Sequence, residues 1–262
     1  MLGKFFADAS LFVGALVLFA AMVGAREIGA FAHRVADRRH GSIPATESDA
    51  NVLLSVALGL LSLLIGFAFS LALSRYDHRR ELVASEASAI TTAAQRIELL
   101  DAPVRDLLMN QVRDYVAVRI AAGESVNIER RNVLERRSTV LSDLLVKSTI
   151  TAVLPLRGTS TATVVLDGVD RALDLADQRR EAENATLPIR VIETLAAYCV
   201  AVAGLFGYAL TSTASRNRVA SYLLFALFAS AIAMILDLDR PRGGAIMVGQ
   251  QPMTEVLQRF SS

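Results

Sequence analysis

Four long apolar segments alternate with polar parts of the chain. They cover residues 5–25, 52–74, 191–213 and 219–236. About 20 consecutive apolar residues in a helix are enough to cross the hydrocarbon core of a bilayer. The pattern therefore predicts four transmembrane helices, arranged as two pairs on either side of a long polar region.

The polar region begins with a continuation of the second apolar segment. After Arg75, apolar residues recur at spacings of seven, four and three, at Tyr76, Val83, Ala87, Ile90, Ala94 and Ile97. These spacings mark one face of a helix. The second membrane helix is therefore expected to continue past the bilayer to about Ile97.

Three more helices are expected before the third apolar segment. Asp101 supplies a candidate N-cap and Pro103 a first-turn residue for a helix that ends near Gly123. The other two are expected over residues 127–154 and 161–185, because apolar residues keep a helical period there and a proline follows each stretch.

The predicted fold class is an all-α integral membrane protein. No segment alternates polar and apolar residues with the period of two that strands need. The chain is expected to divide into a first transmembrane helix pair with an amphipathic loop, a helical region, a second transmembrane pair and a tail. These parts cover residues 1–74, 75–190, 191–236 and 237–262.

The distribution of basic residues predicts the orientation. Within about 15 residues of the spans, the face that holds residues 75–190 and both termini carries nine basic residues, and the other face carries six. The nine are Lys4, Arg75, Arg79, Arg80, Arg179, Arg180, Arg190, Arg240 and Arg242; the six are Arg26, Arg34, Arg38, Arg39, Arg216 and Arg218. The polar region and both termini are therefore expected in the cytoplasm. Residues 26–40 also resemble a helix that lies along the membrane interface, with an apolar stripe opposite its arginines.

Charge and chemistry exclude several classes of function. Lys and Arg number 27 and Asp and Glu 26, and this net charge of +1 gives no electrostatic support for binding to nucleic acid. The three histidines, His33, His40 and His78, have no metal-spaced Cys, Asp or Glu partners, and no phosphate loop or nucleophile motif is present. The sequence predicts no metal site, no cofactor and no enzyme.

The second apolar segment carries a stripe of small residues on one side. At about 100° per residue, one arc of the helix holds Ser55, Gly59, Ser62, Gly66 and Ser70. Small residues allow close packing of membrane helices. Several copies of such a face around an axis would instead leave a conduit, closed by apolar side chains such as Leu63 or Phe67. Both interpretations fit the periodicity.

Three stretches resemble a known family. The run Gly66-Phe67-Ala-Phe-Ser70-Leu71-Ala-Leu-Ser74-Arg75 resembles the second transmembrane helix of bestrophins. The stretches SRYDHRRELVASEASAITTA (74–93) and LDLDRPRGGAIMVGQQPM (236–253) resemble two signatures of the bestrophin-like family of bacterial membrane proteins. The resemblance implies a protein of the bacterial inner membrane.

The resemblance also implies a function. Bestrophins are pentameric ion channels with four membrane helices per subunit and helical cytosolic regions. Their constriction is lined by three apolar residues, four apart, on the second helix. These positions correspond here to Gly59, Leu63 and Phe67. Gly59 departs from the branched apolar residue of the family, which implies a wider upper end of any constriction.

Charged residues follow the second span and the fourth. Beyond the second span stand Arg75, Asp77, Arg79, Arg80, Glu81 and Glu86. They can form ion pairs within the helix or between neighbouring copies, or their basic members can line a vestibule. After the fourth span, animal bestrophins bind calcium through an acidic cluster. This chain has Asp237 and Asp239 beside two arginines, which predicts ion-paired residues instead.

The sequence is consistent with two functions. The first is a bestrophin-like ion channel, assembled from identical subunits in contact with membrane lipid and small inorganic ions. The second is a non-conducting membrane scaffold or sensor whose cytoplasmic helical region binds a partner.

Overall fold

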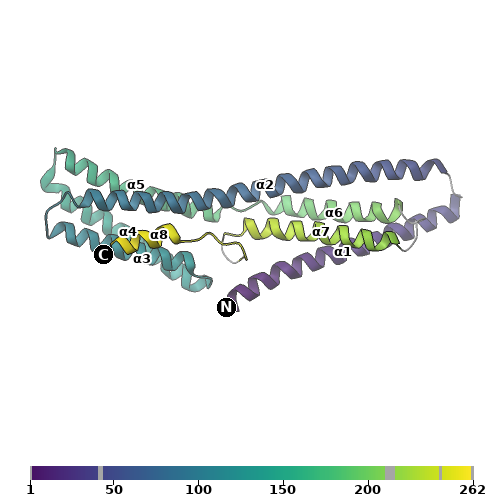
Figure 1. Ribbon diagram of the computed structural model, residues 1–262, viewed down its shortest axis with the longest axis horizontal. Helices are drawn as coiled ribbons and strands as arrows, with labels where there is room; N and C mark the ends of the chain where they lie inside the picture. Colours follow the sequence, from purple (N-terminus) through teal and green to yellow (C-terminus); the bar gives the residue numbers. More distant parts are fainter. Residues whose placement is uncertain (1, 41–43, 210–215, 242–243, 261–262) are drawn as a thin grey trace. The chain divides into compact units, whose positions relative to one another are not determined.

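The computed structural model describes residues 2–40, 44–209, 216–241 and 244–260, and the side chains of 11–38, 52–209, 218–241 and 244–260. Every regular element in these ranges is helical (Figure 1). The elements are α1 (Leu2–His40), α2 (Pro44–Ile97), α3 (Val104–Glu124), α4 (Ile128–Val153), the 3-10 turn η1 (Leu154–Leu156), α5 (Ser160–Asn184), α6 (Ile189–Ala209), α7 (Arg216–Asp239) and α8 (Gln251–Arg259).

The chain forms two compact units. The first, here called the membrane unit, comprises Met1–Ser74, Thr186–Arg240 and Gly244–Ile246. The second, here called the helical body, comprises Arg75–Ala185, Pro241–Gly243 and Met247–Ser262. The long helix α2 belongs to both, because its residues to Ser74 lie in the first unit and those from Arg75 in the second.

Helices α1 and α6 of the membrane unit approach each other through glycines. A Cβ atom on Gly29 would collide with the backbone oxygen of Gly204, and one on Gly207 would collide with the backbone of Arg26. Small residues permit this kind of close backbone approach between membrane helices. The unit's core adds larger buried side chains, among them Met22 and Phe225.

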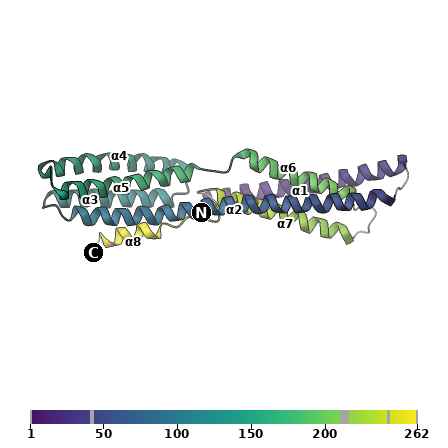
Figure 2. The ribbon, with the colours of Figure 1, turned by 90° about the horizontal axis from the view of Figure 1, so that it is seen from above.

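The helical body packs α3, α4, α5 and α8 with the second half of α2, as the two views in Figures 1 and 2 both show. Its core combines α2 residues such as Ile90 with α3 and α5 residues such as Val116 and Val165. Local signals set the helix starts: the Asn127 side chain accepts a hydrogen bond from the Arg130 N–H at 3.0 Å, which caps α4.

Four of the helical stretches of this unit lie where periodicity predicted them. The continuation of the second span to Ile97 is confirmed, as are the three helices that follow it. The prediction that Asp101 caps α3 was wrong. That helix begins at Val104 without a side-chain cap, and the backbone carbonyl of Asp101 accepts from the Arg105 N–H at 3.1 Å. The tail expected after residue 237 includes α8, which buries Met253 and Val256 in the core of the body.

Five stretches of the described chain are long and apolar enough to cross a membrane. Four of them overlap the four predicted segments, and the fifth is Ile128–Leu156 in the helical body. The distribution of basic residues had predicted a cytoplasmic location for this stretch, as part of residues 75–190. Residues 26–40 are helical but continue α1 directly, so they are not the separate loop segment expected between the first two spans.

Candidate functional site

Within the membrane unit, one side of α2 packs against the rest of the unit. Leu54, Leu61, Ala68 and Ala72 are buried. At about 100° per residue these four positions share an arc of the helix about 40° wide. Leu54 and Leu61 belong to the core formed with α1, α6 and α7. This arc therefore fixes the rotation of α2 in its own subunit.

The three positions that correspond to a bestrophin constriction lie on the other side. Gly59, Leu63 and Phe67 are exposed, with 52% of Leu63 and 60% of Phe67 accessible. Their mean direction is roughly opposite the packed arc at about 100° per residue. The structure thus places these three residues on one outward face of the single chain.

The stripe of small residues borders the same outward face. Ser55, Ser62, Gly66 and Ser70 are all exposed. A Cβ atom added to Gly59 or Gly66 would find no atom of another helix within 4 Å. The stripe therefore does not pack helices within the described chain, where Gly29, Gly204 and Gly207 have that role.

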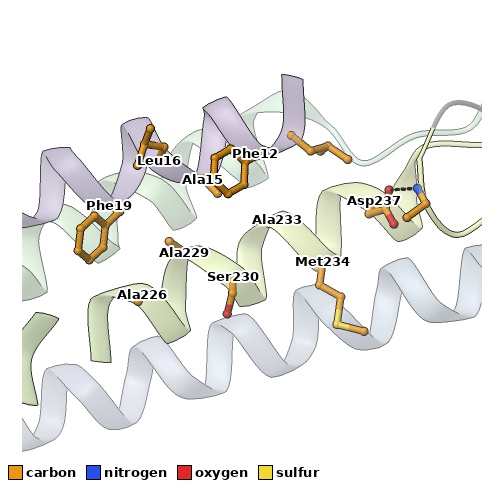
Figure 3. A pocket seen from close by; sticks show the side chains of 12 residues that line it. Phe12, Ala15, Leu16, Phe19, Ala226, Ala229, Ser230, Ala233, Met234 and Asp237 are labelled. Carbon is orange, nitrogen blue, oxygen red and sulfur yellow. Dashed lines mark hydrogen bonds between the residues drawn. The ribbon is translucent and has the colours of Figure 1, made fainter. Parts of the chain in front are cut away.

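A separate apolar groove lies between α1 and α7 of the membrane unit (Figure 3). It encloses about 650 Å³ and is lined by aromatic and aliphatic residues of α1, including Phe12 and Phe19, and by alanines of α7, including Ala229. Asp237 stands at one end of this groove. The α2 positions discussed above take no part in it.

The two aspartates near the end of α7 bind backbone N–H groups. The Asp237 carboxylate accepts from Ala245 at 2.9 Å and Ile246 at 3.1 Å, and the Asp239 carboxylate accepts from Leu187 at 3.0 and 2.8 Å. Both side chains are buried. They therefore tie chain segments together within the membrane unit, a role that the sequence analysis did not anticipate. The described residues hold no group of three or more His, Cys, Asp or Glu side chains suited to a metal ion.

The six charged residues predicted after the second span separate into two groups. Asp77, Arg80 and Glu81 are exposed, and Arg75 is half-buried. Arg79 and Glu86 are buried in the helical body, where the Arg79 Nε donates to the Arg75 carbonyl at 3.2 Å. Glu86 pairs with other helices of the same chain, an arrangement not among the predicted ones.

Glu86 lies between two buried arginines. Arg119 of α3 donates from Nε to Oε1 at 2.8 Å and from a terminal nitrogen to Oε2 at 3.0 Å. Arg179 of α5 donates to Oε2 at 2.8 Å. The exposed fractions of the three side chains are 0%, 2% and 1%. Helices α2, α3 and α5 are thus joined by one buried ion cluster.

Burial and the neighbouring charges act in opposite directions on the pKa of Glu86. Burial raises the pKa of the carboxyl, but the charges and hydrogen bonds of Arg119 and Arg179 outweigh it and hold the pKa below its usual value. Burial lowers the pKa of Arg119, and the Glu86 carboxylate more than reverses this effect, so that pKa is raised. Glu86 and Arg119 are therefore both charged near neutral pH.

The cluster also fixes the C-terminal segment. A terminal nitrogen of Arg179 donates to Oε1 of Gln250 at 2.7 Å, just before α8. A Cβ atom on Gly123 would collide with the Gln250 side chain, so the glycine makes room for it. The Arg113 guanidinium binds the carbonyl of Phe260 at the other end of α8.

Arg119, Arg179 and Gln250 were missed by the sequence analysis. A signal for the two arginines was present. Arg119 continues the buried stripe Leu108, Val112 and Tyr115 at helical spacing, and Arg179 continues Val169, Ala172 and Ala176. A charged residue on the apolar face of a helix must be paired, which points to the buried carboxylate of a neighbouring helix.

The family follows from the sequence over most of the chain. The model of the Bestrophin-like domain matches residues 17–253. The chain belongs to the Bestrophin-like family. This confirms the resemblance drawn from residues 74–93 and 236–253. No curated protein sequence matches the chain significantly.

Solved structures share the Bestrophin-like fold at low sequence identity. Two are point variants of a bacterial Bestrophin homologue from Klebsiella pneumoniae. The first is 13% identical in sequence, and the match covers 94% of this chain and 96% of the homologue's chain, with a TM-score of 0.69. The second is 14% identical, and the match covers 96% of this chain and 95% of the homologue's chain, also with a TM-score of 0.69. A third structure of that homologue, phased on zinc, is 15% identical, covers 95% and 96%, and has a TM-score of 0.65. Identities this low establish the all-helical fold alone.

Proposed function

We propose that this chain assembles as a homo-oligomeric ion channel in which the outward face of α2 lines the conduction pathway. The observation that carries the proposal is the exposure of Gly59, Leu63 and Phe67 opposite the packed side of the helix. In a membrane, such a face contacts either lipid or further copies of the chain. The exposed serines beside it favour an environment with water over lipid tails.

The apolar residues of this face suit a constriction that closes by dewetting. A ring of Leu63 and Phe67 side chains from several copies would exclude water from a narrow passage, whereas Gly59 would leave its end of the passage wider. The characterised relatives in the family are ion channels, which supports the same function. Catalysis forms no part of the proposal.

The proposed assembly is a pentamer in the bacterial inner membrane, in contact with membrane lipid. Each subunit would cross the bilayer through four segments, in α1, α2, α6 and α7, and the helical body and both termini would lie in the cytoplasm. The nine basic residues on that side against six on the other support this orientation. Small inorganic ions are the proposed substrates, and the balanced charge gives no support for nucleic acid as a partner.

Ion flux through the purified protein in liposomes tests the proposal. Potassium and chloride gradients are imposed in turn on vesicles that hold wild-type protein, Phe67→Ala, Leu63→Ala or Leu71→Ala. Leu71 is a matched control for Leu63, because it is exposed to 53%, like Leu63 at 52%, but points about 80° away from Leu63 around the helix, and about 40° away from Phe67. Flux is expected to rise in the first two variants, as the constriction widens, and to stay at the wild-type level in the third.

Two results would reject parts of this proposal. No flux from wild-type protein that is folded and oligomeric would reject the channel and favour the scaffold or sensor. An equal change in Leu71→Ala and Leu63→Ala would reject the constriction while leaving conduction itself in place.

A further inference from the structure

The helical body contains a polar groove that the proposed pore does not use. It encloses about 360 Å³ between the second half of α2 and the middle of α5. Hydroxyl groups of Ser85, Ser88 and Thr92 line it from α2, with Arg96 on the same helix and Arg171 opposite on α5. Binding pockets for small molecules usually enclose about 300–1,000 Å³. The groove is therefore large enough for a small organic ion but not for a large ligand.

Arg96 is held in place in the groove by α5. Its guanidinium donates to the backbone oxygen of Val164 at 3.2 Å and to Oδ2 of Asp167 at 2.6 Å. A Cβ atom on Gly168 would lie 2.7 Å from Cδ of Arg96, so the absence of a side chain there gives the arginine its path across α5. A guanidinium fixed in this way loses little further side-chain entropy when it binds a ligand.

Other polar groups of the groove have unused hydrogen-bonding capacity. Among the described residues, none accepts a hydrogen bond from Arg171 or pairs with the hydroxyls of Ser85 and Ser88. Thr92 donates to the Ser88 carbonyl at 3.0 Å, which leaves its oxygen able to accept. The groove thus combines one fixed guanidinium, one unpartnered guanidinium and free hydroxyl donors.

This set of donors selects for anions. Of the two guanidinium groups that line the groove, that of Arg96 forms an ion pair with Asp167, whereas that of Arg171 has no ion-pair partner among the described residues. Guanidinium groups bind carboxylates and phosphates through charge-assisted hydrogen bonds, and serine hydroxyls add neutral donors. We propose that the groove binds a small anion with a phosphate or carboxylate group. Arg171, Arg96 and the serine hydroxyls donate hydrogen bonds to this group.

The anion has two possible sources, a free solute or the headgroup of an anionic phospholipid. Calorimetric titration with inorganic phosphate and with acetate tests binding, using full-length protein in detergent. The titration is repeated in nanodiscs of phosphatidylcholine alone and of phosphatidylglycerol. If phosphate binds more weakly in phosphatidylglycerol nanodiscs than in phosphatidylcholine nanodiscs, the lipid headgroup competes for the site and is its ligand. Equal phosphate binding in the two kinds of nanodisc would assign the site to a free anion.

Three variants locate the site. Arg171→Gln removes a charge-assisted hydrogen bond and is expected to weaken phosphate binding about tenfold or more. Ser88→Ala removes one neutral donor and is expected to weaken binding about two- to tenfold without a change in charge. Arg136→Gln is the matched control, because Arg136 is exposed on α4 and does not line the groove.

Unchanged binding in Arg136→Gln, together with the expected losses in the other two variants, supports the site. Absence of binding of both probes to folded wild-type protein overturns the proposal. So does a loss in Arg136→Gln as large as that in Arg171→Gln, because the interaction would then follow net charge alone. If Arg171→Gln does not fold, Ser88→Ala decides, since it removes only one hydroxyl. None of these outcomes depends on ion conduction.

Discussion

Replacing Glu86 by Gln removes the carboxylate that Arg119 and Arg179 share. Three charge-assisted hydrogen bonds of 2.8, 3.0 and 2.8 Å end on this carboxylate. A glutamine keeps one acceptor oxygen but presents N–H donors to a guanidinium, and both arginines remain buried with their charge less compensated. Removal of one partner from a buried ion pair destabilises a protein by about 3–5 kcal/mol.

This loss is large enough to measure as a change in melting temperature. For a protein of this size, 1 kcal/mol corresponds to about 2–4 °C in Tm. Glu86→Gln is therefore expected to lower the Tm by roughly 6–20 °C. Far-ultraviolet circular dichroism of the full-length protein in detergent follows the transition, because the chain has no tryptophan for fluorescence.

Glu81→Gln is the matched control. Glu81 lies on the same helix but is exposed, and surface substitutions usually change stability by less than about 0.5 kcal/mol. Its Tm is expected to stay within about 2 °C of the wild type. Equal Tm values for the two variants would refute the argument that the buried ion cluster joins α2, α3 and α5.

Acid should weaken the folded state through the same group. Because folding lowers the pKa of Glu86, the ionised carboxylate stabilises the fold above its ordinary pKa of 4.5, and this stabilisation is lost as the pH falls towards the lowered pKa. The Tm of the wild type is therefore expected to fall more steeply below pH 4.5 than the Tm of Glu86→Gln. Parallel curves of Tm against pH would contradict this. In the membrane unit, Gly207→Ala forces a Cβ atom into the backbone of Arg26 and is expected to cost about 1–3 kcal/mol, measured as a lower Tm. Gly14→Ala, with no atom within 4 Å of the new Cβ, should leave the Tm unchanged or slightly higher, and an unchanged Tm in Gly207→Ala as well would show that the α1 and α6 backbones separate at little cost.

The helices could be predicted from the sequence because their signals are local. The period of apolar residues from Tyr76 to Ile97 carried the second span into the helical body, and α4 and α5 begin next to their capping residues, Asn127 and Thr159. The family was also recognisable, because its signatures at 74–93 and 236–253 are continuous stretches of chain. A pattern within about 20 residues needs no knowledge of distant contacts.

The pairing of charges required the tertiary structure. Glu86 meets Arg119, 33 residues away, and Arg179, 93 residues away. The spacing of charges along α2 left open ion pairs on that same helix, ion pairs with neighbouring copies, and a vestibule lined by the basic residues, because spacing contains no information about which helices lie beside α2. The continuation of α1 through residues 26–40 was likewise missed. A helix with an apolar stripe opposite arginines can lie along the membrane interface or continue the preceding span, and the pattern is the same in both cases.

For the candidate pore face, the sequence determined that Gly59, Leu63 and Phe67 share one side of a helix, since this follows from helical geometry alone. Only the tertiary structure decided that Leu54, Leu61, Ala68 and Ala72 form the packed side and that the small-residue stripe faces outward. Periodicity defines faces relative to one another. The packing of α1, α6 and α7 decides which face of α2 is buried. These helices lie far from α2 in the chain or contact it only after folding.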